Sequence, residues 1–240
     1  MKVTLTRVTE NPVLAIEEAA SNCYDSKPSK NGRIMRSCYE SGHQSVLEFA
    51  DFTFHVELIS RACSHQVVRH RCASYAQRSQ RYVEEDNFRY VTPHTIQMNA
   101  DALAEYIEFM TQCQNTYSNL VELGIPPEDA RYVLPNACCT IIEVKMNGRE
   151  LIHFMNERLC TRAQWEIREL ARNMKKCVEE YSNECKMFSQ FLKPKCCSQW
   201  PFNFCTEQKS CGLVPKLKDV YSAYLDSIES NPKKEGDQNE

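Results

Sequence analysis

Glycine is scarce in this sequence, and its spacing excludes two common ways of binding phosphate. A P-loop needs G-x-x-x-x-G-K-[ST], and a dinucleotide-binding Rossmann turn needs G-x-G-x-x-G. No two of the six glycines fit either spacing; they are Gly32, Gly42, Gly124, Gly148, Gly212 and Gly236. Any phosphate that this protein binds must therefore meet side chains rather than the amides of a glycine loop.

Long apolar runs and an excess of positive charge are missing as well. No run approaches the roughly 18 apolar residues that mark a membrane span, and the stretch from Met1 to Thr6 has no apolar signal core. The formal net charge of −3 argues against general coating of nucleic acid, which depends on positive charge. We expect no membrane association, no nucleic-acid partner and a cytoplasmic location.

Cysteine, in contrast, is abundant, with 14 among 240 residues. Disulfide scaffolds are usually short and rich in loops, and a chain of this length buries enough surface to fold without them. Six cysteines lie in helix-like segments, where a free thiol behaves as a small apolar side chain. They are Cys23, Cys38, Cys63, Cys113, Cys160 and Cys177. We expect reduced thiols.

The hydrophobic patterns predict an α/β (α+β) fold in which long helices flank a mixed or antiparallel sheet in a single domain. Predicted strands are 3–8, 52–57 and 138–146, and the segment 72–98 is expected to be irregular. Predicted helices are 11–23, 33–41, 59–70, 100–123, 128–134, 150–191 with a break near 160, and 216–228. Asn11 is expected to cap the first helix, and Asn147-Gly148 to form a turn. We expect one domain over 1–195 and a Cys-rich extension over 196–240.

One segment carries a concentrated positive charge. From Leu58 to Val83 there is no Asp, Glu or Lys, but there are five arginines: Arg61, Arg69, Arg71, Arg78 and Arg81. Arginine suits phosphate because its planar fork donates two parallel hydrogen bonds. Arg61, His65 and Arg69 are four residues apart, so a helix would place them on one face. The alternative is a solvated basic face that pairs with acids elsewhere, but the interleaved Ser and Gln residues favour an anion site.

The amino-acid sequence of this segment resembles that of a known protein family. The run from Arg69 to Tyr82, Arg-His-Arg-Cys-Ala-Ser-Tyr-Ala-Gln-Arg-Ser-Gln-Arg-Tyr, resembles the motif of the flavin-dependent thymidylate synthases. Further blocks in the family's order are Gly42–Glu48, Phe52–Phe54, Arg131–Pro135, Asn147–Arg149 with Phe154 and Arg158, and Ala163–Arg168. The resemblance covers roughly residues 1–195.

The resemblance implies an activity and its cofactors. Members of this family methylate dUMP at uracil C5 to give dTMP, with 5,10-methylenetetrahydrofolate as the carbon donor. They bind FAD and reduce it with NADPH, and they assemble as homotetramers with active sites at subunit interfaces.

The resemblance also assigns roles to individual residues. Arg158 would act on the uracil, and Ser79 would take part in the catalytic site, chiefly by positioning. Expected flavin contacts are Arg69, His70, Arg71, Asn147, Arg149 and His153. Expected dUMP contacts are Gln66, Arg69, Gln77, Arg78, Ser79, Arg81, Arg131 and Arg158. Four positions depart from the common family pattern: Phe49, Ala76, His153 and Arg162.

Other interpretations compete at single positions. Ser79 has no base beside it in the sequence to make it a nucleophile, and Cys72 is a weaker candidate still. No metal site is predicted, because the tail cysteines lack the paired C-x2-C spacing of zinc sites. Those tail residues are Cys196, Cys197, Cys205 and Cys211. They are expected to be loose thiols or a redox-labile pair.

A different class of function remains open at the level of sequence. A non-catalytic nucleotide- or RNA-binding module would use the same arginine segment, 61–81, together with aromatic side chains for stacking. Such a module has no need for the block from Asn147 to Arg168, and it would not carry a flavin.

Overall fold

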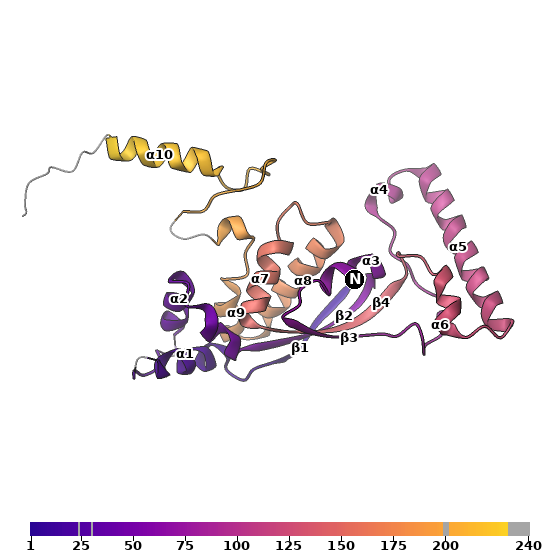
Figure 1. Ribbon diagram of the computed structural model, residues 1–240, viewed down its shortest axis with the longest axis horizontal. Coiled ribbons are helices and arrows are strands. Elements are labelled where there is room, and N and C mark those ends of the chain that lie inside the picture. Colours follow the sequence, from indigo (N-terminus) through magenta and orange to yellow (C-terminus); the bar gives the residue numbers. More distant parts are fainter. Residues whose placement is uncertain (24, 30, 199–201, 230–240) are drawn as a thin grey trace, which may run out of the picture.

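The computed structural model describes residues 1–23, 25–29, 31–198 and 202–229 (Figure 1). Within these residues, four strands form one sheet in the order β1-β2-β4-β3, and every neighbouring pair is antiparallel. They are β1 (Lys2–Val8), β2 (Asp51–Ser60), β3 (Ala73–Gln77) and β4 (Cys139–Asn147). The predicted fold class is confirmed, with the antiparallel form of the sheet.

Helices make up most of the remaining chain. They are α1 (Pro12–Asn22), α2 (Arg33–Glu40), α3 (Arg61–Val67), α4 (His94–Gln97), α5 (Ala100–Glu122), α6 (Pro127–Ala130), α7 (Gly148–Arg158), α8 (Trp165–Tyr181), α9 (Asn183–Ser189) and α10 (Leu217–Glu229). Three short 3₁₀ helices are η1 (Gln44–Phe49), η2 (Arg131–Val133) and η3 (Lys195–Cys197).

The two faces of the sheet differ sharply in polarity. On one face, the buried side chains of β2 and β4 alternate with outward-facing residues, as in a strand that is buried on one side only. Phe52, Phe54 and Val144 on this face belong to the core that α1, α7, α8 and α9 complete. The other face carries His55, which lies beside the carboxylates of Glu57 and Glu143. The helices that build the candidate site therefore lie on the apolar face.

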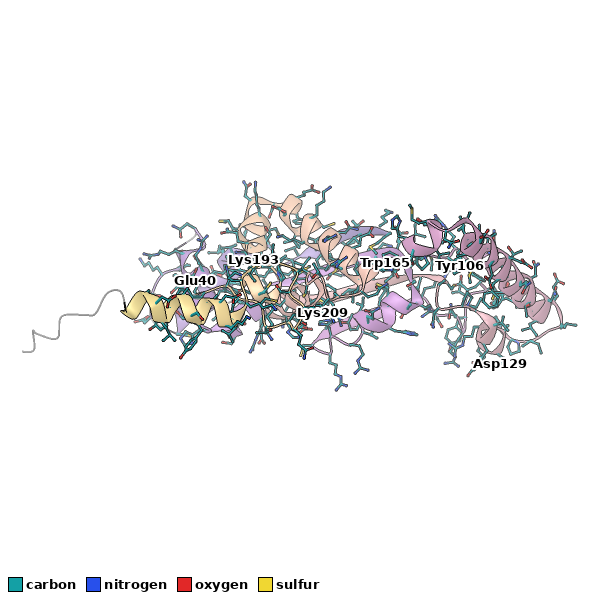
Figure 2. All side chains as sticks on the ribbon, turned by 90° about the horizontal axis from the view of Figure 1, so that it is seen from above. Glu40, Tyr106, Asp129, Trp165, Lys193 and Lys209 are labelled. Atoms are coloured by element: carbon teal, nitrogen blue, oxygen red, sulfur yellow. The ribbon has the colours of Figure 1, made fainter. Side chains whose placement is uncertain are left out.

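A second, smaller core lies at the far end of the sheet. There α5 projects from the body with α4 and α6 (Figures 1 and 2), and Met110 and Cys113 pack with Phe88 and Cys138. Met110 and Cys113 of α5 are buried in this core, but Ile107 of the same helix is 45% exposed. An extended helix that packs along only part of its length leaves such side chains without cover in the single chain.

Some predictions of local structure were wrong, and others were right only in part. Asn11 stands at the N-cap position of α1, as predicted, but its backbone is left-handed with φ of 48° and its side chain makes no capping hydrogen bond. Asn147-Gly148 is not a turn, because β4 runs directly into α7 and the Asn147 side chain caps that helix. The segment 150–191 is divided among α7, α8 and α9, and β3 lies in the stretch expected to be irregular.

The C-terminal segment differs from the body in how it packs. In Figure 1, α10 lies apart from the sheet and its covering helices. All fourteen cysteines fall among the described residues, where none of them forms a disulfide. Across the described ranges, no helix is both long and apolar enough to span a bilayer.

Candidate active site

The start of α3 is anchored by a buried carboxylate on α8. Glu166 accepts hydrogen bonds from the Ser60 backbone N–H at 2.7 Å and from the Ser60 hydroxyl at 2.6 Å. The Ser60 hydroxyl oxygen in turn accepts from the Cys63 backbone N–H and so caps α3. The predicted helix over 59–70 therefore begins at Arg61, since Ile59 and Ser60 still pair with β4.

A β-bulge in β2 directs the chain toward the contact between Ser60 and Glu166. The register of β2 against β4 shifts between Glu57 and Ile59, and Leu58 between them has a φ of 61°. A left-handed backbone is strained for a residue with a side chain, and bulges of this kind re-aim side chains near functional sites. Here the bulge comes just before the helix that leads to the arginine segment.

A tyrosine of β3 fixes the turn that follows α3. The Tyr75 hydroxyl lies 2.7 Å from the carbonyl oxygen of His70 and 2.9 Å from that of Val67. It has one proton to donate, so it serves one of these carbonyls at a time. Burial raises the pKa of Tyr75, which keeps the hydroxyl a donor. Tyr75 thus fixes the backbone that carries His70.

His70 and Arg158 form the centre of the site. The Arg158 Nε–H donates to His70 Nε2 at 3.0 Å, and Arg158 Nη2 reaches the Gln66 carbonyl oxygen at 3.4 Å. Burial is the main cause that lowers the pKa of His70 to about 4, and the charges of Arg158 and His153 act in the same direction. His70 is therefore neutral at physiological pH and able to accept from Arg158.

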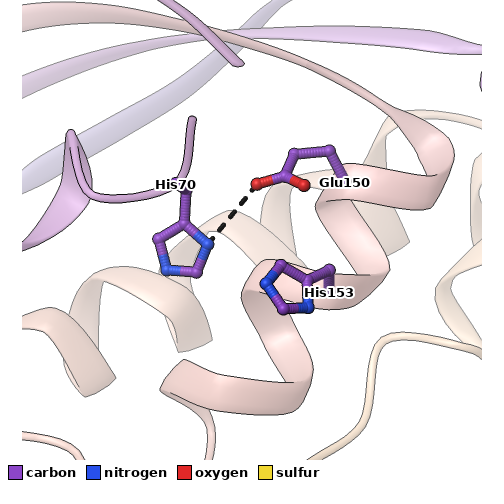
Figure 3. Close-up of side chains that lie close together, drawn as sticks. All are labelled: His70, Glu150 and His153. Atoms are coloured by element: carbon purple, nitrogen blue, oxygen red, sulfur yellow. Dashed lines mark ion pairs between the residues drawn. The ribbon is translucent and has the colours of Figure 1, made fainter. Parts of the chain in front are cut away.

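Two further residues of α7 face the His70 ring (Figure 3). Glu150 Oε1 lies 3.5 Å from His70 Nδ1, and the two side chains are only 8% and 4% exposed. The His153 ring packs edge-on, with its centroid 5.5 Å from that of His70. Burial raises the pKa of Glu150. Glu150 was not predicted from the sequence; an acid in an otherwise apolar helix face was the signal that could have found it.

An open pocket of about 570 Å³ adjoins this group. It brings together three of the residues predicted to contact flavin, namely Asn147, Arg149 and His153, along with Glu150 and Cys72. The Asn147 side-chain oxygen accepts from the Glu150 backbone N–H, and Arg149 pairs with Glu48 at 2.8 Å. Pockets of this size are typical of small-molecule sites.

Arg69 and Arg71 lie on the exposed turn between α3 and β3. Among the described residues neither has an ion pair, so both guanidinium groups are open to solvent. Because α3 ends at Val67, only Arg61 and His65 of the three residues spaced by four lie within the helix. The prediction that Arg69 shares their helical face was wrong.

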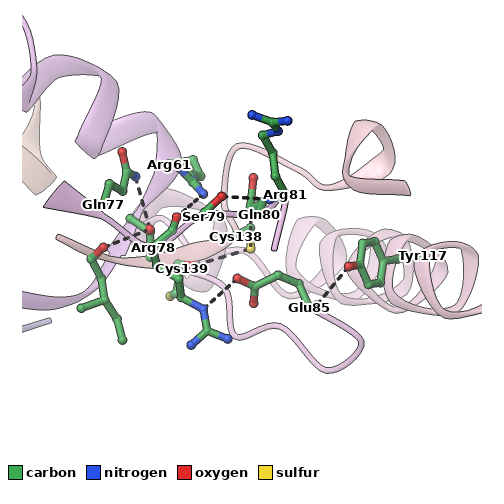
Figure 4. Close-up of polar contacts among 12 residues, drawn as sticks. Arg61, Gln77, Arg78, Ser79, Gln80, Arg81, Glu85, Tyr117, Cys138 and Cys139 are labelled. Atoms are coloured by element: carbon green, nitrogen blue, oxygen red, sulfur yellow. Dashed lines mark hydrogen bonds and ion pairs between the residues drawn. The ribbon is translucent and has the colours of Figure 1, made fainter. Parts of the chain in front are cut away.

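The segment Gln77–Arg81, the nucleotide loop, holds four residues predicted to contact dUMP and lies at the other end of β3 (Figure 4). The Gln77 amide donates to the hydroxyls of Ser64 and Thr140, so this side chain is used inside the fold. The Ser79 hydroxyl oxygen accepts from the Arg81 backbone N–H at 3.2 Å. No imidazole or carboxylate bonds to Ser79 in the described structure, as a nucleophile would require.

The arginines of this loop are paired with acids. Arg78 lies 3.1 Å from Glu85, and Arg81 donates twice to one oxygen of Glu128, at 3.0 and 2.9 Å. Arg131 donates to the Glu128 carbonyl oxygen. The Arg81–Glu128 pair is exposed on both sides and contributes little to stability, so a phosphate can displace it. None of these residues lines the pocket formed by Asn147, Arg149 and His153.

The Cys-rich tail packs against the C-terminal end of α7. A second pocket there, of about 210 Å³, is lined by Arg158, Cys160, Cys196, Cys205 and Cys211, among others. The Sγ atoms of Cys196 and Cys197 are 3.9 Å apart, and burial raises the pKa of Cys196 to about 12. The Cys196 thiol is therefore protonated at physiological pH. In the described residues, none of these cysteines belongs to a group of side chains that could hold a metal ion.

Comparison with known proteins agrees with this geometry. The family model for "Thymidylate synthase complementing protein" matches residues 4–182. Flavin-dependent thymidylate synthases from two organisms are close relatives. That of Geobacter sulfurreducens is 46% identical over 75% of this chain and 82% of its own length. That of Pyrococcus furiosus is 38% identical over 95% of this chain and 99% of its own length.

A solved structure shares the fold. The flavin-dependent thymidylate synthase of Helicobacter pylori, complexed with FAD and dUMP, superposes with a TM-score of 0.62. It is 22% identical in sequence, and the match covers 75% of this chain and 97% of that one.

These matches define the class of protein: the chain is an enzyme, a transferase that acts in nucleotide metabolism. More narrowly, it belongs to the flavin-dependent thymidylate synthase family. The non-catalytic binding module finds no support, because the match runs through the block from Asn147 to Arg168 that such a module does not need.

Proposed function

We propose that this protein methylates dUMP to dTMP, with 5,10-methylenetetrahydrofolate as carbon donor and FAD reduced by NADPH as hydride carrier. It works in the cytoplasm as a homotetramer with shared active sites. The observation that carries this proposal is Arg158 paired with neutral His70, whose ring packs on His153, a residue that lines a pocket together with Asn147 and Arg149.

The residues around this pocket fit a flavin. Asn147 and His153 offer polar atoms of the kind that hydrogen-bond to a flavin ring, while the Arg149 guanidinium suits a pyrophosphate. Arg69 and Arg71 add exposed positive charge on the adjoining turn, and His70 supports that turn from within the fold. When bound, FAD supplies the redox chemistry, and the protein supplies position and field.

Arg158 is suited to stabilise charge on the pyrimidine. Uracil C5 is a weak nucleophile, so its attack on the methylene carbon needs a group that stabilises the developing negative charge on the ring. A fixed cation in a partly buried site does this at little reorganisation cost. Two Arg158 donors are used by His70 and Gln66, which leaves the remaining N–H groups for the substrate.

The nucleotide loop is proposed to hold the dUMP phosphate. Ser79, Arg81 and Arg131 lie close together through their shared contacts at Glu128 and the loop backbone. Arg78 and the backbone of Gln77 extend the same loop, and Gln66 and Arg69 reach the nucleotide from the side of α3. A dianionic phosphate offers these arginines a stronger partner than one carboxylate.

Assembly explains why the loop and the pocket are apart in one chain. In a homotetramer, the nucleotide loop of one subunit would lie next to the pocket of another subunit that Asn147, Arg149 and His153 line. The long exposed stretch of α5, with Ile107 and Phe109, offers apolar surface for such contacts. We further propose that residues 1–195 form the catalytic domain and 196–240 an extension.

The direct test is anaerobic turnover. Purified protein should be yellow, and dUMP should perturb its flavin absorbance. With NADPH, methylenetetrahydrofolate and dUMP present, dTMP should form, and omission of any one should stop it. A colourless protein that makes no dTMP would contradict the proposal.

The Arg158→Ala substitution tests the assigned catalytic group. We expect dTMP formation to fall by at least roughly 100-fold, the scale seen when a charge-stabilising donor is removed, while FAD content stays near normal. Arg172→Ala, which removes an exposed arginine of α8, is the matched control and should turn over normally. Near-normal turnover in Arg158→Ala would refute the role.

A further inference from the structure

Glu150 is a buried acid that the proposed chemistry does not use. It stands in the first turn of α7, is 7% exposed, and its Oε1 atom has no hydrogen bond among the described residues. Burial of a carboxyl group is costly unless a partner compensates it. The atom of opposite character that faces it is His70 Nδ1 at 3.5 Å, which also has no hydrogen bond in the described structure.

The protons of this group can be assigned from the donors and acceptors. A guanidinium N–H only donates, so His70 Nε2 must carry the lone pair that accepts from Arg158. Neutral imidazole has one proton, and it must then be on Nδ1, the atom that points toward Glu150 (Figure 3). The three side chains are therefore aligned in one direction. The Arg158 Nε–H donates to His70 Nε2, and His70 Nδ1–H points to the Glu150 carboxyl group.

The same assignment excludes a metal ion as the purpose of the cluster. One ligand atom each from His70, Glu150 and His153 lies within 4.8 Å of the others, which resembles a cation site. A metal at His70 Nδ1 would need the lone pair there, but the only lone pair of the neutral ring is taken by Arg158. The positive charge of Arg158 would also repel the ion.

We propose that Glu150 is a positioning residue, which acts through His70 to hold the Arg158 guanidinium in its reactive orientation. This inference rests on the proposed function. Loss of the acceptor oxygen at position 150 frees the His70 ring to turn or to exchange tautomers. A ring with its proton on Nε2 presents a donor to the Arg158 donor. Arg158 then loses its fixed place beside His70.

The charged and polar groups that face His70 are few. Glu150, His153 and Arg158 approach from α7, and the Tyr75 hydroxyl contacts the His70 carbonyl from β3. Phe154 covers the remaining side, with its ring centroid 4.8 Å from that of His70. No second acid among the described residues lies within ion-pair distance of the ring to take over from Glu150.

Two substitutions separate the acceptor from the charge. Glu150→Gln keeps an oxygen acceptor for Nδ1–H, and kcat should stay within roughly threefold of wild type. Glu150→Leu keeps the volume but removes the acceptor, and kcat should fall roughly 100-fold, the scale of a misplaced catalytic group. KM for dUMP and FAD content should change little. Glu17→Gln, which alters a buried carboxylate of α1, controls for neutralising a buried acid and should retain kcat.

A double-substitution test shows whether the effect passes through Arg158. Arg158→Lys removes the Nε–H that bonds to His70, so adding Glu150→Leu to it should cost less than roughly threefold further activity. A full 100-fold additional loss would overturn the proposal, as would wild-type kcat in Glu150→Leu alone.

A measurement on the protein itself does not depend on turnover. Nitrogen NMR of protein labelled at histidine, with His70 assigned by substitution, should show Nδ1 protonated and Nε2 unprotonated in wild type and in Glu150→Gln. Glu150→Leu should show a mixture of tautomers. An Nε2-protonated ring in wild type would overturn the positioning role, whereas an enzyme with the expected ring but no dTMP formation would contradict the proposed function instead.

Discussion

At the scale of single residues, the protonation state of His70 decides whether Arg158 is held. A neutral ring accepts from the Arg158 Nε–H, while a protonated ring has donors on both nitrogens. The fold therefore disfavours the proton, and the pKa of His70 falls to about 4 through burial and the nearby positive charges. The unfolded chain pays no such penalty, so stability and pH are linked at this residue.

The sign of that linkage follows from the two pKa values. The unfolded ring binds a proton below about pH 6.5, while the folded ring does not until about pH 4. Stability from this group is full above pH 6.5 and falls, by at most about 3 kcal/mol, as the pH drops toward 4. The raised pKa of Glu150 has the opposite sign, since it favours the fold at low pH and loses that contribution as the pH rises.

The His70→Gln substitution should remove most of the loss in stability between pH 7 and pH 4.5. Urea unfolding at a series of pH values measures this slope. His94→Gln, at an exposed histidine of α4, should keep the wild-type slope. An unchanged slope in His70→Gln would mean that other groups dominate the acid sensitivity.

Ser79 is expected to position dUMP rather than attack it. Ser79→Ala should weaken dUMP binding about tenfold, as expected for one hydrogen bond to a charged group, and leave some deuteride transfer from reduced flavin. Substrate titration and isotope transfer measure the two effects. Complete loss of turnover with intact dUMP binding would instead make Ser79 an essential chemical participant.

At the scale of elements, the junction of β4 and α7 places two site residues. Asn147 ends the strand and caps the helix, and Gly148 lies against η1, so Arg149 and His153 face the pocket from one rigid element. A Cβ atom on Gly148 would approach the Leu47 carbonyl oxygen to 2.6 Å and the Phe188 ring to 3.0 Å. Backbone and a packed ring are both hard to move, so this glycine is needed for close packing.

Gly148→Ala should therefore destabilise the fold by about 1–3 kcal/mol, the usual cost of overpacking. Chemical denaturation measures the loss, and flavin content should fall with it because α7 must shift. A variant within about 0.5 kcal/mol of wild type would show that α7 moves away from η1 freely.

At the scale of the whole molecule, the tail falls into two parts. The part before α10 packs on the end of α7, with Cys205 buried and the Ser198 hydroxyl donating to Asn156. The side chains of α10 described over 217–227 are exposed or half-buried. Only the first part is expected to contribute to the stability of the body.

Removal of residues 217–240 should leave the free energy of unfolding within about 0.5 kcal/mol of wild type, as for other exposed sites. Removal of 196–240 should lower it clearly, because it uncovers the end of α7. Thermal and urea unfolding of both truncations compare them. A large loss from the shorter deletion would indicate that α10 packs against another subunit.

The sequence alone determined the elements with strong periodicity and the residues with distinctive chemistry. Burial on one face makes β1 and β2 alternate, and β4 carries a run of β-branched residues, so these strands were visible as patterns. The arginine segment was visible as charge. The sequence shows these features because each of them depends only on residues that are close together along the chain.

Only the tertiary structure decided what these residues do to one another. β3 is short and polar and becomes a strand because β4 offers it a partner, and α3 ends early because Tyr75 holds the turn after it. Glu150, His70 and Arg158 meet across 88 residues of sequence, and their protonation depends on burial that no local pattern reports. Burial and contact between distant segments exist only in the packed chain. The protonation state of the site therefore depends on the tertiary structure.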